Sequence, residues 1–170
     1  SLGTTVATAD LATSAAGAIE IDETDSITLS RVMTYDGSIT VDAGGAITAM
    51  LVDSSATDNN ANDISLTTIS GDIAVVTVTA GDTNDVTLTA SGAISEDGDA
   101  STVVTGDELT AIAVGSISLD TTVATADLAT SAAGDIDIDE TDSVHLATVT
   151  TADGSVTVDA GGALTVALVD

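Results

Sequence analysis

A long internal repeat constrains this chain more than any other feature. Residues 1–53 and 118–170 are identical at 40 of 53 positions and differ at 13, at an offset of 117 residues. Repeats of this kind are typical of solenoids, propellers and domain arrays. We therefore expect residues 1–170 to be one continuous segment cut from a longer array. It holds one 117-residue repeat (1–117, the first repeat) and a partial second repeat (118–170).

A shorter period within the long repeat selects among these architectures. Seven short stretches with alternating apolar residues start 20, 25, 22, 23, 27 and 20 residues apart. They are Ile19-Glu20-Ile21, Ile39-Thr40-Val41, Ile64-Ser65-Leu66, Val86-Thr87-Leu88, Leu109-Thr110-Ala111, Ile136-Asp137-Ile138 and Val156-Thr157-Val158. A second apolar stretch begins about eight residues after each, at Ile27, Ile47, Ile73, Ile94, Ile117, Val144 and Leu164. A looser apolar patch follows most pairs. Three short strands in each turn of 20–27 residues indicate an all-β fold, a parallel β-helix or β-solenoid.

The residue pattern inside each turn agrees with this fold. Alternate residues of a strand point to opposite faces, so the apolar residue at each end of a stretch points inward and the middle residue points outward. Where the two repeats differ, Ile27 becomes Val144 at an inward position and Thr28 becomes His145 at an outward one. Glycine stands two residues before many of these strands, where a tight corner of the backbone needs it. Proline, which cannot donate to a β-ladder, is absent.

Composition excludes several classes of function. The formal charge is −27, with a single Arg and no Lys, so the chain lacks the basic surface that binding to nucleic acid requires. It has no apolar run of about 18 residues, which argues against insertion into a membrane. Cysteine is absent, so disulfides and thiolate metal sites are excluded. A mean hydropathy of +0.43 indicates a chain that folds despite its charge.

The string Gly-Ser-Ile-Thr-Val-Asp-Ala-Gly-Gly-Ala-Ile-Thr-Ala at residues 37–49 resembles the repeats of filamentous-haemagglutinin-type bacterial surface adhesins. The resemblance extends over essentially the whole chain. It implies a right-handed β-helical shaft, exported by a bacterium, in a cell-surface or secreted fibre. We therefore expect a structural rod or adhesin shaft rather than an enzyme. Unpaired strands at the ends of such a rod favour end-to-end self-association, and cations between carboxylates would bridge rods laterally. The receptor or glycan is unknown.

Acidic clusters are the recurring chemical feature. Carboxylates grouped in turns are the oxygen ligands that Ca²⁺ prefers, and a self-repelling acidic chain is relieved by divalent cations. The alternative is a solvated acidic face with diffuse counterions. No other cofactor is required. The candidate calcium ligands are Asp22, Glu23, Asp25, Asp58, Asp63, Asp82, Asp85, Glu96, Asp97, Asp99, Asp139, Glu140 and Asp142.

Two alternative functions stay open from the sequence. Asp82-Thr83-Asn84-Asp85 is similar to the acidic motif of cadherin linkers, so one alternative is a Ca²⁺-dependent adhesin of tandem β-sandwich (cadherin- or Ig-like) domains, one per 117 residues. The other is a solenoid that binds ice or glycans through outward threonines. These form two expected ladders, with Thr40, Thr87, Thr110 and Thr157 on one face and Thr28, Thr48 and Thr165 on another. The lone histidine, His145, is expected at the surface.

Overall fold

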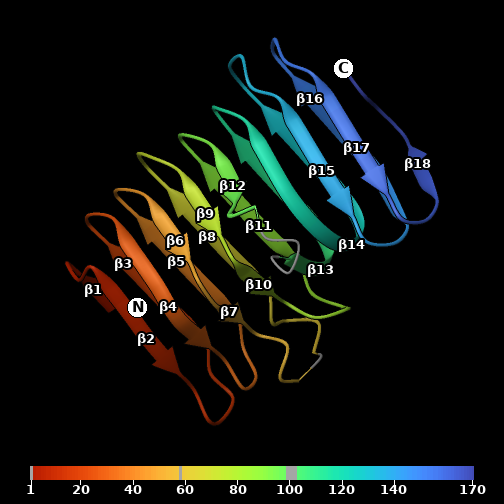
Figure 1. Cartoon of the computed structure of the whole chain (residues 1–170). Helices are drawn as coiled ribbons and strands as arrows, with labels where there is room; N and C mark the ends of the chain where they lie inside the picture. Colours follow the sequence, from red (N-terminus) through yellow and green to blue (C-terminus); the bar gives the residue numbers. More distant parts are fainter. Residues whose placement is uncertain (1, 58, 99–102) are drawn as a thin grey trace.

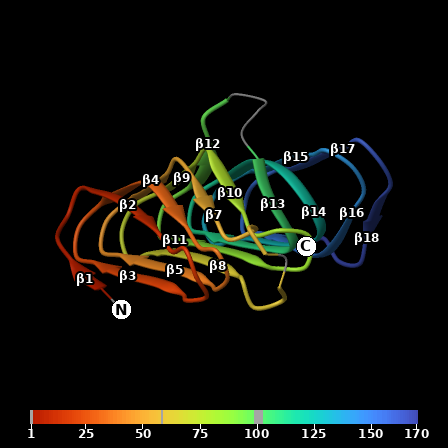
Figure 2. The ribbon, with the colours of Figure 1, turned by 90° about the horizontal axis from the view of Figure 1, so that it is seen from below.

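The chain winds through about eight turns of a parallel β-solenoid. The structure is a computed structural model that describes residues 2–57, 59–98 and 103–170, and these residues contain strands and turns but no helix (Figure 1). In Figure 2 the coils follow one another as loops around a common interior. The expected fold class is therefore confirmed.

Most strands are short because each coil turns a corner after three to five residues. The described residues form eighteen strands: β1 (Leu2–Thr4), β2 (Thr8–Ala12), β3 (Ile19–Glu23), β4 (Ile27–Met33), β5 (Ile39–Ala43), β6 (Ile47–Ala49), β7 (Val52–Asp53), β8 (Ile64–Thr68), β9 (Ile73–Val75), β10 (Thr77–Thr79), β11 (Val86–Ala90), β12 (Ile94–Glu96), β13 (Val103–Ala113), β14 (Ile117–Thr130), β15 (Ile136–Glu140), β16 (Val144–Thr151), β17 (Val156–Ala160) and β18 (Leu164–Val166).

The strands stack into three sheets, each built from one side of successive coils. Sheet 1 contains β1, β3, β5, β8, β11, the second half of β13, the second half of β14, β16 and β18. Sheet 2 contains the start of β2, the first half of β4, β6, β9, β12, the start of β14, β15 and β17. Sheet 3 contains the ends of β2 and β4, β7, β10, the first half of β13 and the middle of β14.

All these ladders are parallel and join one coil to the next. A β-sandwich pairs its strands in antiparallel sheets, so the alternative of tandem β-sandwich domains is wrong. The backbone hydrogen bonds of each coil are instead made to the coils on either side of it.

The interior is a stack of aliphatic side chains aligned from coil to coil. In sheet 2 the aligned inward residues are Ile27, Ile47, Ile73, Ile94, Ile117, Ile136 and Val156. The first six of these are at most 2% exposed. Strand β3 shows the expected alternation, with Ile19 and Ile21 buried and Glu20 exposed. Isoleucine and valine suit this environment because their branched side chains fit a pleated, tightly stacked surface.

The two sequence repeats do not occupy the same sheets, so the seven alternating stretches do not all stack on one another. Ile19 lies in sheet 1, whereas its equivalent Ile136 pairs with Ile117 and Val156 in sheet 2. In sheet 1 the residue that follows Leu109 is Ala126, only 17 positions later. The coil is this short because β14 runs through from sheet 2 to sheet 1 without a loop. The 117-residue repeat therefore covers five full turns and then the further stretch of chain that leads from sheet 1 to sheet 2.

A stack of glycines at the corner before sheet 2 accounts for part of this arrangement. A Cβ placed on Gly134 would lie 2.5 Å from the carbonyl carbon of Gly115, and one on Gly154 would lie 2.2 Å from the carbonyl oxygen of Gly134. No larger residue fits where the backbones of successive coils come this close. Gly71, which begins the stack, also has a φ of +104°. Glycine is needed in this stack mainly because the backbones of neighbouring coils come too close for a Cβ. A positive φ is the reason at only a few positions.

Candidate functional site: the acidic corners of the solenoid

Glu140 lies at a corner of the solenoid, where its carboxylate binds the backbone of the turn. It is only 4% exposed. It accepts hydrogen bonds from the Thr121 hydroxyl at 2.8 Å, from the Val123 N–H at 3.1 Å and from the Asp142 N–H at 3.2 Å. The carboxylate thus satisfies two backbone donors that the corner would otherwise leave unpaired.

Glu23 makes the equivalent contacts in the first repeat. Its carboxylate accepts hydrogen bonds from the Thr4 hydroxyl, from the Val6 N–H at 2.9 Å and from the Asp25 N–H at 3.2 Å. The side chain is 2% exposed. The recurrence of one arrangement in both repeats indicates that this glutamate is part of how the corner folds.

The two glutamates differ in the direction of their pKa. The hydrogen bond from Thr4 lowers the pKa of Glu23 below its usual value. Burial raises the pKa of Glu140, and this effect outweighs the hydrogen bond from Thr121. Both glutamates have a paired coil on either side. The difference lies in the coil that donates to them: Thr4 and Val6 belong to the first coil of the described solenoid, whereas the coil of Thr121 and Val123 is itself covered by β13. Removal of water from around the carboxylate therefore dominates only at Glu140.

These contacts divide the two repeated acidic clusters into inward and outward members. The side chains of Glu23 and Glu140 turn inward and bind their own corners. The neighbouring aspartates are exposed to solvent: Asp22, Asp25, Asp139 and Asp142. Each cluster was predicted as one group of calcium ligands, and the structure separates the glutamates from the aspartates.

A second set of carboxylates forms a column at the corner that leads into sheet 1. Asp63 accepts a hydrogen bond from the Asp85 N–H at 3.1 Å. Burial raises the pKa of Asp85, and the charges of Asp63 and Asp107 add to it. Burial likewise raises the pKa of Glu108, with further contributions from Asp85 and Asp127. Four successive coils therefore bring acidic side chains into one crowded line.

A shallow groove of about 340 Å³ lies beside this corner. Its lining includes three aspartates from three coils, Asp82, Asp107 and Asp142, together with the hydroxyl residues Thr122 and Ser143. Two of these aspartates, Asp82 and Asp142, were predicted as calcium ligands from separate sequence clusters. Asp107 was not predicted, and neither were Glu108 and Asp127 of the column. No local sequence signal marks them, because their proximity depends on the register between coils.

The other predicted ligands are placed as follows. Glu96 accepts a hydrogen bond from the Gly98 N–H, and Asp97 is exposed. Asp58 and Asp99 lie outside the described residues. Among the residues that the structure describes, no three histidine, cysteine, aspartate or glutamate side chains come together in a group able to hold a metal ion. Calcium binding therefore stays a prediction.

The insertion before β8 is organised by buried asparagines. The Asn62 side chain is fully buried and donates to the Thr57 carbonyl oxygen at 2.6 Å, and its backbone N–H donates to Asn84 Oδ1 at 3.1 Å. The Ser54 hydroxyl donates to the Asn62 carbonyl oxygen. This asparagine-rich segment closes a corner from the inside through its buried hydrogen bonds.

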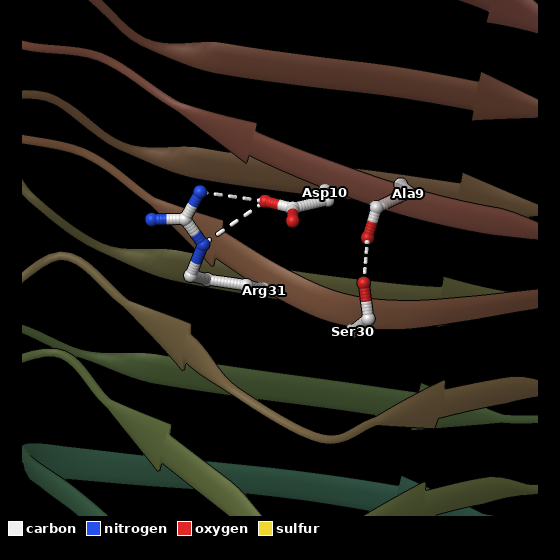
Figure 3. Close-up of polar contacts among 4 residues, drawn as sticks. All are labelled: Ala9, Asp10, Ser30 and Arg31. Atoms are coloured by element: carbon white, nitrogen blue, oxygen red, sulfur yellow. Dashed lines mark hydrogen bonds and ion pairs between the residues drawn. The ribbon is translucent and has the colours of Figure 1, made fainter.

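The single arginine pairs with an aspartate near the N-terminal end (Figure 3). Arg31 Nη2 and Nε lie 2.8 and 2.9 Å from Asp10 Oδ1, and both side chains are at least half exposed. Just before Arg31, the register between β2 and β4 shifts, and the bulged residue Ser30 donates to the Ala9 carbonyl oxygen at 2.8 Å. An exposed pair of this kind contributes little to stability. It neutralises one of the 28 acidic residues.

Part of the expected threonine pattern is present. Thr40, Ser65, Thr87 and Thr110 align on the outer side of sheet 1. Thr157 does not join them, since it pairs with Asp137 in sheet 2. Thr28 and Thr48 pair in sheet 2, whereas Thr165 pairs with His145 in sheet 1. The cause is the change of sheet between the two repeats.

His145 lies at the surface, as expected. Its ring is exposed, and Nδ1 is 3.0 Å from the Thr165 hydroxyl. Within the described part of the chain, no helix is long and apolar enough to cross a lipid bilayer.

Comparison with protein-family models, with curated proteins and with solved structures finds no match for this chain.

Proposed function

We propose that this chain is a segment of an extracellular structural rod, the shaft of a bacterial surface fibre or adhesin. The observation that carries the proposal is the uninterrupted stack of parallel coils, about eight turns long, around one aliphatic interior. The resemblance of residues 37–49 to repeats of surface adhesins supports the location. The role is mechanical rather than catalytic.

The hydrogen-bond pattern suits a load-bearing rod. Strands β3 and β5 pair over five residues, and β5 and β8 pair over five more. Backbone hydrogen bonds between coils run along the rod axis, so a pulling force is shared by all the ladders of each coil. The coils are about 4.8 Å apart, which makes the segment about 38 Å long.

The rod itself is tested by lengthening it. Small-angle X-ray scattering of the chain and of a variant with one more 117-residue repeat would give length and cross-section separately. Five turns and a partial one add about 26 Å of length at an unchanged cross-section. An extra repeat that instead appears as a second globule on a flexible link contradicts the proposal.

The location is tested on cells that produce the full-length protein. Antibodies against the chain should label intact cells or their shed fibres as strongly as they label permeabilised cells. Labelling that appears only after permeabilisation would reject an extracellular role while leaving the rod architecture in place.

End-to-end association is part of the proposal. The ends of the described solenoid expose aliphatic side chains, with Leu2 and Val6 at one end and Val166 and Leu168 at the other, each 46–51% exposed. Unpaired strands at these ends can add a further coil. Light scattering should show oligomers that grow with concentration, and Val166→Lys should shorten them. Unchanged oligomers in this variant would exclude the C-terminal end.

Divalent cations are proposed as counterions of the rod. A charge of −27 on a folded body of 170 residues repels itself, and in the column at Asp85 and Glu108 neighbouring carboxylates add to the effect of burial on each other's pKa. A chelated sample titrated with CaCl₂ should melt at a higher temperature. If NaCl at matched ionic strength gives the same increase, specific calcium sites are excluded and diffuse screening remains.

A further inference from the structure

One surface of the solenoid gathers the residue types that the rest of the chain lacks. The chain has one Tyr, one Arg and two Met. Arg31, Met33 and Tyr35 alternate outward along β4 and the bend that follows it. Met50 lies next to this segment on the following coil, where its N–H donates to the Leu29 carbonyl oxygen at 3.0 Å. We call the surface formed by Arg31, Met33, Tyr35 and Met50 the Tyr35 patch.

The coil winds in the same way without these residue types. In the first repeat Asp10 pairs with Arg31 after a shift of register, and in the second repeat Asp127 pairs with Thr148 after the same shift. The other equivalents of the patch residues are small: Thr150, Ala152 and Ala167. Since the fold does not need Tyr, Arg or Met at these positions, their side chains are free to contact another molecule.

The composition of the patch is that of a protein interface. Tyr, Met and Arg are enriched at such interfaces, and Tyr and Arg are frequent hot spots. Tyr35 is 51% exposed, Met50 44% and the Arg31 side chain 50%. One exposed apolar residue is ordinary, but here the sole aromatic residue of the chain and both methionines lie together. Methionine also adapts its shape to different partners.

The backbone beneath the patch is held by both neighbouring coils. The Tyr35 N–H donates to the Thr13 hydroxyl at 3.0 Å, and its carbonyl oxygen accepts from the Thr57 hydroxyl at 3.0 Å. Met33 lies between Ala12 on one coil and Asp53 on the other. The side chains of the patch therefore project from a fixed surface, which lowers the entropic cost of binding.

The border of the patch is acidic, which defines the charge of its partner. Asp10 neutralises Arg31 (Figure 3). Asp36 follows Tyr35 in the chain, and Asp53 lies beside Met33. These two aspartates complement a partner with basic residues. A second copy of the chain cannot supply such residues, because it has no Lys and its single Arg is bound to Asp10.

We propose that the Tyr35 patch binds a short polypeptide segment of another protein, in which basic residues flank an apolar side chain. The apolar side chain packs on Tyr35 and the methionines, and the basic residues meet Asp36 and Asp53. A glycan fits less well, because methionine offers it no hydrogen bond and the Arg31 guanidinium is bound to Asp10. The inference goes beyond the proposed function, and it needs only the coils that contain β2 to β7.

The size of the patch indicates a segment of a few residues. Arg31 and Tyr35 are about 13 Å apart along the strand, at about 3.3 Å per residue, and three coils span about 10 Å. A standard interface buries about 800 Å² on each partner, which is several times this area. Binding of one segment is therefore weak and reversible.

A display library of random peptides tests the proposal with the full chain. The matched control carries the residues of the second repeat, Arg31→Thr, Met33→Thr and Tyr35→Ala, and circular dichroism confirms that it is folded. Selection in 0.3 M NaCl screens the diffuse attraction of basic peptides to the rest of the acidic surface. We expect peptides that are enriched at least tenfold on the unchanged chain over the control, with Lys or Arg beside Leu, Ile or an aromatic residue.

The residues of the patch report where a selected peptide binds. In a chain with isotope-labelled methionine methyl groups, the synthetic peptide should shift the signals of both Met33 and Met50. In the control variant it should leave the Met50 signal unchanged. Replacing the basic residues of the peptide with Glu should weaken binding at least tenfold. A peptide without aromatic residues should also change the fluorescence of Tyr35, the sole aromatic residue.

Several outcomes would overturn the inference. It is wrong if no peptide is enriched, if the enriched peptides lack basic residues, or if both methionine signals stay in place. Maltohexaose that shifts these signals where peptides do not would assign the patch to glycans. Signals that move with the concentration of the chain alone would assign it to a second copy. The scattering experiment is independent of these results, so the rod stands if peptide binding fails, and peptide binding stands if the rod fails.

Discussion

Replacement of Ile94 by alanine tests the interior of the solenoid directly. Ile94 is completely buried and lies between Ile73 and Ile117 in the aligned stack of sheet 2. Its neighbours are held at the spacing of the coils by backbone hydrogen bonds, so they cannot move together to fill the space that the substitution leaves.

The expected cost has two parts. Removing three carbon groups from the interior loses about 2.4 kcal/mol of transfer free energy, at about 0.8 kcal/mol for each group. A residual cavity of roughly 60 Å³ adds about 1.5 kcal/mol, at about 24 cal/mol per Å³. We therefore expect Ile94→Ala to lower the free energy of unfolding by about 4 kcal/mol.

The measurement is urea unfolding followed by circular dichroism in the far ultraviolet. The matched control is Ile69→Ala, the same substitution at a side chain that is 77% exposed, which should cost less than about 0.5 kcal/mol. Because coils interact mainly with their neighbours, the unfolding transition of Ile94→Ala should broaden as well as shift.

Similar unfolding midpoints for Ile94→Ala and Ile69→Ala would refute the stacking described here. Such a result would mean that Ile94 is not enclosed, and hence that the assignment of sheet 2 to the interior is wrong.

Three further predictions concern the corners and the charge. Gly134→Ala should lower the melting temperature, at a cost of about 1–3 kcal/mol in the free energy of unfolding, because the new Cβ would meet the Gly115 backbone. The control is Gly17→Ala, where a Cβ meets nothing within 4 Å and the melting temperature should not change. Calorimetry compares the two variants. Glu140→Ala should lower the free energy of unfolding by about 2–4 kcal/mol in urea, since two buried N–H groups lose their acceptor. A similar loss of stability on replacing the exposed neighbour, in Asp139→Ala, would contradict the role of Glu140 in binding the corner. Melting temperature should rise between pH 7 and about pH 4.5, because burial raises the pKa of four carboxyls in the folded state, those of Asp85, Glu108, Asp120 and Glu140. The stabilising contribution of these carboxyls is complete below the pKa of the unfolded chain and is lost as the pH rises through the folded pKa. The lowered pKa of Glu23 acts in the opposite direction, and a melting temperature that falls throughout this range would show that its type of contact dominates.

The local pattern of the chain was sufficient to predict its fold class. Alternation such as Ile19-Glu20-Ile21 depends only on the period of two in a strand, and its recurrence every 20–27 residues favours a stack of coils. The strands β3, β5 and β8 begin at the predicted residues and alternate as expected. The same local logic placed His145 outward.

The candidate sites were less predictable, because they depend on the direction of individual side chains. Glu23 and Glu140 belong to acidic strings that were predicted as calcium ligands or, alternatively, as a solvated face, yet both side chains turn inward to bind corner N–H groups. Glu108 and Asp127 were not selected at all, since they become neighbours only through the pairing of β13 with β14.

By itself the sequence determined that the chain stacks short parallel strands around an aliphatic interior, because side-chain alternation and repeat spacing are local properties. Only the tertiary structure decided which strand lies above which. The short passage from Leu109 to Ala126 moves the second repeat to another sheet, and with it the threonine ladders and the acidic columns. The physical reason is that register between coils is set by the number of residues at each corner, and that number varies from coil to coil without a period.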